Sequence, residues 1–250
     1  AHKVVEKLVN YLPDYLEHTK ENNQQLQSEM ERLSHSFLLP EPEINHIKDL
    51  KSELSAQEAV VHSSLEDTAE MKKPFSLVRE ELEAIQDRLK EIEDEQIELG
   101  EQLEKIEKDD VNARQKVTIY ANKLHTIKRF MEKRNLPGIP ESFLTIFFGA
   151  SDYIEELARE LEATRVNIES VNRWLEILAN TMNELEEETY RIVRNSTLTE
   201  QLLQYSNRYR SFDDNVQAAF NESLHAFEVE FDYAKSLEII SKALDVVEPG

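Results

Sequence analysis

Residues 78–106 read VREELEAIQDRLKEIEDEQIELGEQLEKI, and this stretch decides the fold. Alternating steps of four and three residues from Val78 meet an apolar side chain at nearly every position as far as Met131, with interruptions only at Gln96 and Asp110. A hydrophobic repeat of about 3.5 residues is typical of helices that pack knobs-into-holes. The sequence therefore predicts one helix over about residues 75–134, roughly 90 Å long at about 1.5 Å per residue.

The same spacing predicts a helix over residues 1–37, which ends before a proline-rich break at residues 39–42. A second helix follows, and its stripe runs through Met71 into the long repeat without a change of phase. A proline inside a helix kinks it at a cost of about 3 kcal/mol. The unbroken phase nevertheless favours a kinked, continuous helix at Pro74, and a turn at residues 72–74 is the alternative.

Downstream of the long helix, the Asn-Leu-Pro-Gly-Ile-Pro sequence of residues 135–140 predicts a break, because it combines two prolines with a glycine free to adopt positive φ. A second stripe with 3-4 spacing over residues 154–192 predicts the next helix. The Ser196-Thr197 pair would cap a last helix, with Glu200 closing a capping box. That helix is expected over about residues 198–247.

A short internal repeat supports a modular architecture, since Asp14-Tyr15-Leu16-Glu17 recurs as Asp152-Tyr153-Ile154-Glu155. The order helix, turn, helix, continuous junction, helix, turn, helix is typical of stacked three-helix repeats, in which the last helix of one repeat runs into the next. The predicted fold is all-α and elongated, with antiparallel triple-helical bundles joined by long continuous helices. Residues 1–74 would be two helices of a partial repeat, and residues 75–250 a complete one.

Composition limits the classes of function. The 250 residues carry 51 acidic and 29 basic side chains, for a net charge of -22, and no cysteine. Such a charge repels nucleic acid and anionic membranes, and the lack of cysteine excludes disulfides, thiolate nucleophiles and Cys-ligated zinc. No apolar run is long enough to span a membrane. Because the sequence begins inside what already resembles a helix, we interpret it as a fragment, and any anchor would lie outside it.

Catalytic and metal motifs are also missing. The sequence has no His-Glu-x-x-His, no glycine-rich phosphate loop and no serine or cysteine elbow. Glu43…His46 and Glu222…His225 have the spacing of di-iron bundles, but the predicted layout places them in different bundles. We therefore expect no enzyme activity, no metal and no cofactor. The paired carboxylates of residues 80–110 are interpreted as a solvated helix face.

Two windows free of acidic residues stand out in so acidic a chain. The first, residues 112–131, contains five cationic side chains and is expected to face Glu155, Glu156 and Glu160 on the antiparallel helix that follows. The second, residues 201–212, contains the polar side chains Gln204, Asn207, Arg208, Arg210 and Ser211.

In this second window Gln204, Asn207 and Arg208, together with Ser211, would share one helix face. Planar amides and a guanidinium suit a peptide backbone or a carboxylate. Polar contacts between bundled helices are an equally good explanation of the spacing.

The sequence resembles one known family at several places. Gln204-Tyr205 with Asn207-Arg208-Tyr209-Arg210-Ser211, the 135–141 segment Asn-Leu-Pro-Gly-Ile-Pro-Glu and the terminal Val246-Val247-Glu248-Pro249-Gly250 resemble EzrA, the septation ring formation regulators of Gram-positive bacteria. The resemblance covers the whole chain as the C-terminal part of the cytoplasmic region. It implies spectrin-like repeats tethered to the membrane by an N-terminal helix, and a partner-binding patch at Gln204, Asn207 and Arg208, to which we add the neighbouring Arg210.

The resemblance also implies a function at the division septum, on the cytoplasmic face of the membrane. The expected role is a scaffold and negative regulator of FtsZ ring assembly, with FtsZ and other division proteins as partners and no nucleic acid. Self-association is open. The alternative is a purely structural coiled-coil spacer without a peptide site, and a third hypothesis, a di-iron enzyme, fits the sequence least.

Overall fold

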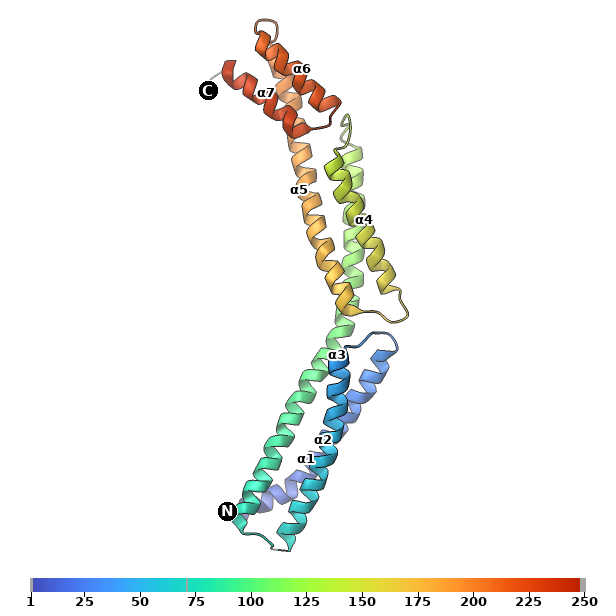
Figure 1. Cartoon of the computed structure of the whole chain (residues 1–250), viewed down its shortest axis with the longest axis vertical. Helices are drawn as coiled ribbons and strands as arrows, with labels where there is room; N and C mark the ends of the chain where they lie inside the picture. Colours follow the sequence, from blue (N-terminus) through green and yellow to red (C-terminus); the bar gives the residue numbers. More distant parts are fainter. Residues whose placement is uncertain (1, 71, 248–250) are drawn as a thin grey trace. The chain divides into compact units, whose positions relative to one another are not determined.

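The protein is built from α-helices connected by short loops (Figure 1). The computed structural model describes residues 2–70 and 72–247. Ala1, Met71 of the predicted apolar stripe, and residues 248–250 of the C-terminal motif lie outside the described residues. Within these ranges there are seven helices and no strand: α1 (His2–Ser34), α2 (Glu41–Ala69), α3 (Phe75–Glu132), α4 (Glu141–Leu161), α5 (Ile168–Ser206), α6 (Asp214–Glu228) and α7 (Tyr233–Val247). The predicted all-α class is confirmed.

Contacts divide the chain into two compact units, and α3 contributes to both. Unit 1 comprises the described residues up to Asn112 together with the segment Glu162–Glu169, and unit 2 comprises the rest. Residues 75–112 of α3 thus lie with α1 and α2 in unit 1. The repeats predicted for residues 1–74 and 75–250, and their spectrin-like character, stay predictions.

Unit 1 is held together by the apolar stripes that the sequence shows. Each of its three helices contributes side chains that are almost completely buried: Leu12 and Leu33 from α1, Ile47 and Leu50 from α2, and Leu82, Leu89 and Ile92 from α3. Burying a leucine or isoleucine side chain stabilises a fold by about 1.5–3 kcal/mol. The predicted heptad register of α3 is therefore the register that packs.

The prediction of a continuous helix through Pro74 is wrong. The carboxylate of Glu53 in α2 accepts hydrogen bonds from Nε and Nη2 of Arg88 at 2.5 and 2.6 Å, and Nε2 of the earlier His46 lies 2.9 Å from the carboxylate of Glu95. Earlier residues of α2 thus meet later residues of α3, so the two helices are antiparallel and the chain reverses between them. Pro74 lies immediately before α3, where a missing N–H costs nothing.

Two predicted breaks are confirmed: the helix breaks between Ser34 and Glu41, so that Leu39 and Pro40 of the predicted break at 39–42 precede α2, and residues 135–140 precede α4. In the second break the positive φ belongs to Asn135, at 50°, and not to Gly138. Gly138 serves a different purpose, because a Cβ there would lie 2.5 Å from the ring of Phe231. The Tyr233 hydroxyl also donates a 2.6 Å hydrogen bond to the Gly138 carbonyl, so this loop is fixed against the α6–α7 turn.

The prediction of one helix over residues 154–192 is also wrong, since α4 ends at Leu161 and α5 begins at Ile168. The intervening residues pair with the α1–α2 loop within unit 1. The N–H of Val166 donates to Ser36 O at 2.8 Å, and the N–H of Leu38 donates to Val166 O at 2.9 Å. The break is therefore stabilised by partners far away in the sequence.

The predicted cap near residue 197 is wrong as well, because the helix α5 runs through this segment to Ser206. The hydroxyls of Ser196 and Thr197 donate to Val193 O at 3.1 and 2.8 Å, so they are satisfied inside the helix. The single last helix expected over residues 198–247 is replaced by the end of α5 and by α6 and α7.

The helices α6 and α7 form a hairpin that packs against the end of α5 in unit 2 (Figure 1). Leu203 of α5 and Ile240 and Leu244 of α7 form its buried cluster. Between α6 and α7, Ser223 and Ser236 are fully buried, and each hydroxyl donates to the other residue's carbonyl, at 2.8 and 2.7 Å. These small side chains satisfy one another and let the two helices approach closely.

Candidate partner-binding site

The predicted patch of Gln204, Asn207, Arg208 and Arg210 lies where α5 ends, and we call these four residues the arginine patch. Gln204 is on the last turn of α5, and the other three lie in the turns of residues 207–212 that connect α5 to α6. The N–H groups of Tyr209 and Arg210 donate to Ser206 O at 2.9 and 3.1 Å. The expectation of one regular helix face is thus wrong beyond Ser206, although the turns keep the four residues adjacent along the chain.

All four side chains of the arginine patch are exposed to solvent. The Arg208 guanidinium carbon is 5.0 Å from the ring centroid of Tyr205, and that of Arg210 is 4.9 Å from the ring centroid of Phe220. Cation–π contacts of this kind hold a guanidinium by its face and leave its N–H edges available for a partner. The exposure argues against the alternative that these residues bond bundled helices together.

The arginine patch is supported by partly buried aromatic side chains. Tyr205 and Tyr209 have ring centroids 5.8 Å apart and pack against the cluster of Leu203, Ile240 and Leu244. Phe212, at the end of the same turns, is 90% exposed. The patch predicted from the sequence contains the polar residues and not this aromatic support. The aromatic residues at positions 205, 209, 212 and 220 are the feature of the sequence that could have indicated it.

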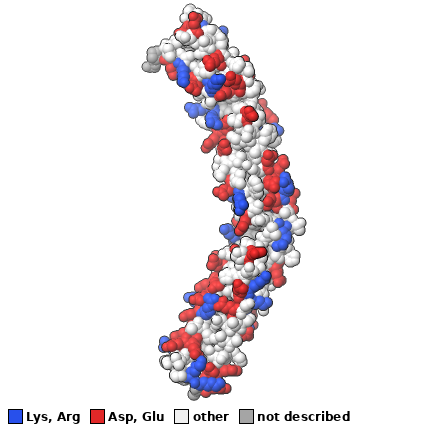
Figure 2. All heavy atoms as spheres, in the orientation of Figure 1, with Lys and Arg blue, Asp and Glu red and all other residues white. Residues whose placement is uncertain are grey.

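The electrostatics around the patch favour an anionic or carbonyl-bearing partner. No acidic residue occurs in the window 201–212. The first one after it, Asp213, is engaged as the N-cap of α6, where its carboxylate accepts the N–H groups of Asn215 and Val216 at 2.8 and 3.2 Å. Elsewhere carboxylates dominate, and Figure 2 shows acidic side chains distributed over both units on the face that it draws.

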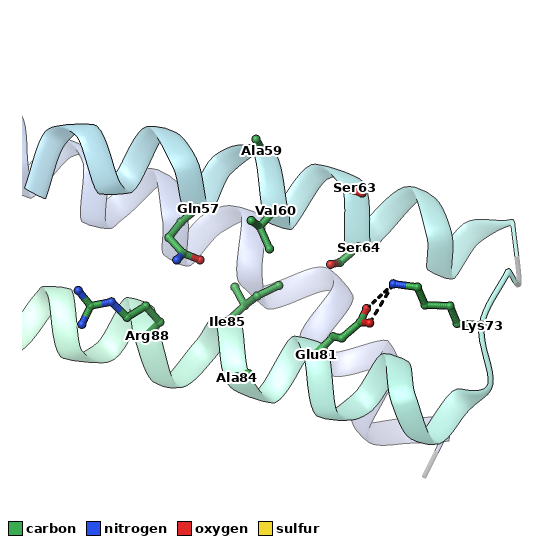
Figure 3. A pocket seen from close by; sticks show the side chains of 10 residues that line it. All are labelled: Gln57, Ala59, Val60, Ser63, Ser64, Lys73, Glu81, Ala84, Ile85 and Arg88. Carbon is green, nitrogen blue, oxygen red and sulfur yellow. Dashed lines mark hydrogen bonds and ion pairs between the residues drawn. The ribbon is translucent and has the colours of Figure 1, made fainter.

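A separate groove lies between α2 and α3 in unit 1 and has a volume of about 630 Å³ (Figure 3). Val60 and Ile85 give it an apolar floor, and Lys73 reaches over one end. Its charged groups already have partners: Lys73 Nζ is 2.9 Å from both carboxylate oxygens of Glu81, and Arg88 is paired with Glu53. The pKa of Lys73 is raised by its hydrogen bonds to Glu81 and Asp67. This groove contains no unpaired charge that would select a ligand.

Two cationic residues of the first acid-free window, residues 112–131, have partners other than the predicted glutamates. Lys123 pairs with Glu186 of α5 at 2.8 Å, and this contact raises the pKa of the lysine. Arg114 donates a 2.7 Å hydrogen bond to Leu161 O. Among the acids expected to face this window, Glu156 pairs with Arg159 on its own helix. In the cationic window Lys123 thus pairs with α5, and Arg114 bonds to the last residue of α4.

No metal-binding group emerges from the residues that the structure describes. No cluster of three or more His, Cys, Asp or Glu side chains is positioned to hold an ion there. His46 contacts Glu95 in unit 1, and His225 contacts Glu230 at 3.4 Å in unit 2. The same described ranges contain no helix that is both long and apolar enough to cross a membrane.

Comparison with known proteins identifies the family. The family model described as "Septation ring formation regulator, EzrA" matches residues 1–250. The chain belongs to this family. Among curated EzrA proteins, those of Streptococcus sanguinis, Streptococcus gordonii and Streptococcus pneumoniae are 75%, 66% and 55% identical over all 250 residues. The chain spans 44% of the length of each of these relatives. No solved structure matches it.

Proposed function

We propose that this chain is part of a cell-division scaffold that negatively regulates FtsZ ring assembly by binding and geometry, without catalysis. It acts at the division septum, on the cytoplasmic face of the membrane, to which an N-terminal anchor outside these residues attaches the longer protein. Its partners are FtsZ and other division proteins. The observation that carries the proposal is the EzrA family match along the whole chain.

The arginine patch supports a binding role for this part of the protein. Its side chains are exposed, two of its cations are held by aromatic rings, and the segment is free of acids in a chain with a net charge of -22. Guanidinium and amide groups held in this way suit the backbone carbonyls or carboxylates of a docking peptide. We therefore propose that Gln204, Asn207, Arg208 and Arg210 contact a division partner.

Sedimentation of FtsZ polymers tests the proposed regulation. FtsZ assembled with GTP would be pelleted with and without the purified chain, and bovine serum albumin at equal concentration would serve as the inert protein control. The proposal expects less FtsZ in the pellet and a direct complex in a pull-down. Unchanged polymer together with no complex would contradict it and would favour the purely structural spacer.

A further inference from the structure

Gln96, which interrupts the apolar stripe of α3, is buried in the core of unit 1 and is only 4% exposed. Its amide meets α1 at the fully buried Thr19, where Gln96 Nε2 donates a 2.9 Å hydrogen bond to Thr19 O. One turn later in α1, Asn23 is buried as well. We call Thr19, Asn23 and Gln96 the polar layer. The buried residues on either side of it are apolar: Leu16, Leu26, Ile92 and Leu99.

The polar layer lowers the stability that the core could otherwise reach. Gln96 Oε1 and Asn23 Oδ1 are buried and have no hydrogen-bond partner among the residues that the structure describes. A carbonyl oxygen in this position has lost its hydrogen bonds to water and has gained none in return. Leucine at either position would remove this penalty, so stability does not account for the polar layer.

The helices α1 and α3 run parallel in unit 1, and contacts between their side chains define one register. The Tyr15 hydroxyl donates to Glu93 at 2.6 Å, and Arg32 Nη1 donates to Glu107 at 2.8 Å. Later residues of α1 thus meet later residues of α3. The bond from Gln96 to the Thr19 carbonyl lies between these two contacts and belongs to the same register.

Apolar packing alone discriminates weakly between this register and its neighbours. If α1 moved by one heptad along α3, Leu12 or Leu26 would take the place of Thr19 opposite Gln96. Thr19 would then face one of the buried leucines of α3. A leucine side chain opposite Gln96 would separate the amide from the α1 backbone, and a buried N–H without a partner opposes the slip. The polar contact is therefore what distinguishes the registers.

We propose that Gln96, through its bond to Thr19, determines the register of α1 on α3 at a cost in stability. Single buried polar residues specify the register of coiled coils in this way. The register also places the α1–α2 loop, because Ser36 and Leu38 exchange backbone hydrogen bonds with Val166 in the same unit. A slip of one heptad would move this loop by about 10 Å along the helix axis and break that pairing.

Cross-linking can report the register, because the chain contains no cysteine of its own. Pairs of cysteines are introduced into the intact chain and treated with a bismaleimide that spans less than one heptad, about 10 Å. Arg32→Cys with Glu107→Cys is the native pair, since these side chains are in contact. Arg32→Cys with Gly100→Cys is the start-shifted pair, which meets only if α1 slips towards the start of α3. Gln25→Cys with Glu107→Cys is the end-shifted pair, for a slip in the other direction.

In the chain with Gln96 in place, only the native pair should cross-link. Gln96→Leu should raise the urea midpoint, lose part of the native cross-link and gain a shifted one. Gln96→Leu with Leu89→Gln moves the amide by one heptad and should transfer the cross-link to the start-shifted pair, because the amide then meets Thr19 only after the slip. Gln102→Leu is the matched control, since Gln102 is exposed on the same helix, and it should leave the cross-links unchanged. Circular dichroism would verify that each variant is folded.

Two outcomes would overturn the proposal. Gln96→Leu could keep the native cross-link alone, which would mean that the α1–α2 loop or the flanking contacts set the register. Its urea midpoint could instead fall, which would mean that the polar layer stabilises unit 1. If the double variant does not fold, Gln96→Leu by itself decides between these outcomes. A higher midpoint together with a shifted cross-link supports the proposal.

Discussion

Gly138 and Gly149 have opposite surroundings, and this difference predicts opposite effects of the same substitution. A Cβ at Gly138 would lie 2.5 Å from the Phe231 ring, whereas a Cβ at Gly149 of α4 would meet nothing within 4 Å. We expect Gly138→Ala to lower the free energy of unfolding by about 1–3 kcal/mol through overpacking. Gly149→Ala should raise it by up to about 1 kcal/mol, because alanine is the better helix former.

Urea denaturation of the two alanine variants beside the parent chain measures both effects. Gly138 does not have a positive φ, so the expected loss comes from the ring contact alone. An unchanged midpoint for Gly138→Ala would show that the Phe231 ring moves aside freely, contrary to the proposed fixation of the loop.

The environment of Tyr15 predicts that the free energy of unfolding falls at alkaline pH. Burial, followed by the 2.6 Å hydrogen bond that its hydroxyl donates to Glu93, raises its pKa above the ordinary value of about 10. The folded state therefore favours the neutral phenol. The contribution of the Tyr15 hydroxyl to the free energy of unfolding is complete at pH values below the pKa of tyrosine in the unfolded chain. This contribution is lost as the pH rises through the raised pKa of Tyr15 in the folded chain.

The variant Tyr15→Phe isolates this contribution. Between about pH 9 and pH 11 its free energy of unfolding should fall less steeply with pH than that of the parent chain. Tyr190→Phe is the control for the loss of a tyrosine hydroxyl, because Tyr190 is 69% exposed. Equal slopes for the parent chain and Tyr15→Phe in urea titrations would refute the prediction.

At the level of residues, the sequence indicates the polar side chains of the arginine patch but not the residues that support them, and the binding role of the patch stays a prediction. Gln204, Asn207 and Arg208 were visible because they lie in a window free of acids. The packing of Arg210 on Phe220 of α6 was not predictable, because it depends on a turn that reverses the chain after Ser206. A reading that extended one helix from residue 198 to 247 could not bring these two side chains together.

Among the elements, the start of α6 depends on one side chain. Asp213 accepts the N–H groups of Asn215 and Val216, which would otherwise lack partners at the helix start. Asp213→Ala should therefore lower the free energy of unfolding by about 1 kcal/mol. Asp214→Ala, which removes the neighbouring exposed carboxylate and no cap, should cost clearly less, and equal losses in chemical denaturation would argue against the cap.

Two of the misassigned elements share one physical cause. A 3-4 stripe continued through both Pro74 and residues 162–167, yet the chain leaves the helix at each place. Leu161 and Ile168 are seven residues apart, so the loop between them keeps the phase that a helix would have. Periodicity therefore locates the buried face but does not show that the helix is continuous. The second break in addition depends on pairing with residues 36–38, which no local pattern reveals.

For the whole molecule, the acidic all-α character and the family were predictable from the sequence, because both follow from features that recur along its full length. The packing units were less predictable. The long helix α3 belongs to both units, with the boundary at Asn112, and no proline or glycine marks that point in the sequence. Only the exchange of packing partners along an unbroken helix defines it.

We propose that this chain binds FtsZ, as its division partner, through an exposed patch that the fold does not need. The most direct measurement is FtsZ co-sedimentation with the variant Gln204→Ala, Asn207→Ala, Arg208→Ala, run beside thermal and urea unfolding. Gln115→Ala, Asn122→Ala, Arg129→Ala is the matched control, since it removes the same residue types from exposed positions of α3.

We expect both triple variants to lose no more than about 1.5 kcal/mol in the free energy of unfolding, and only the patch variant to lose its FtsZ complex. A loss of several kcal/mol in the patch variant would instead mean that these residues hold the helices together. A stable patch variant that binds FtsZ as well as the parent chain does would contradict the claim directly.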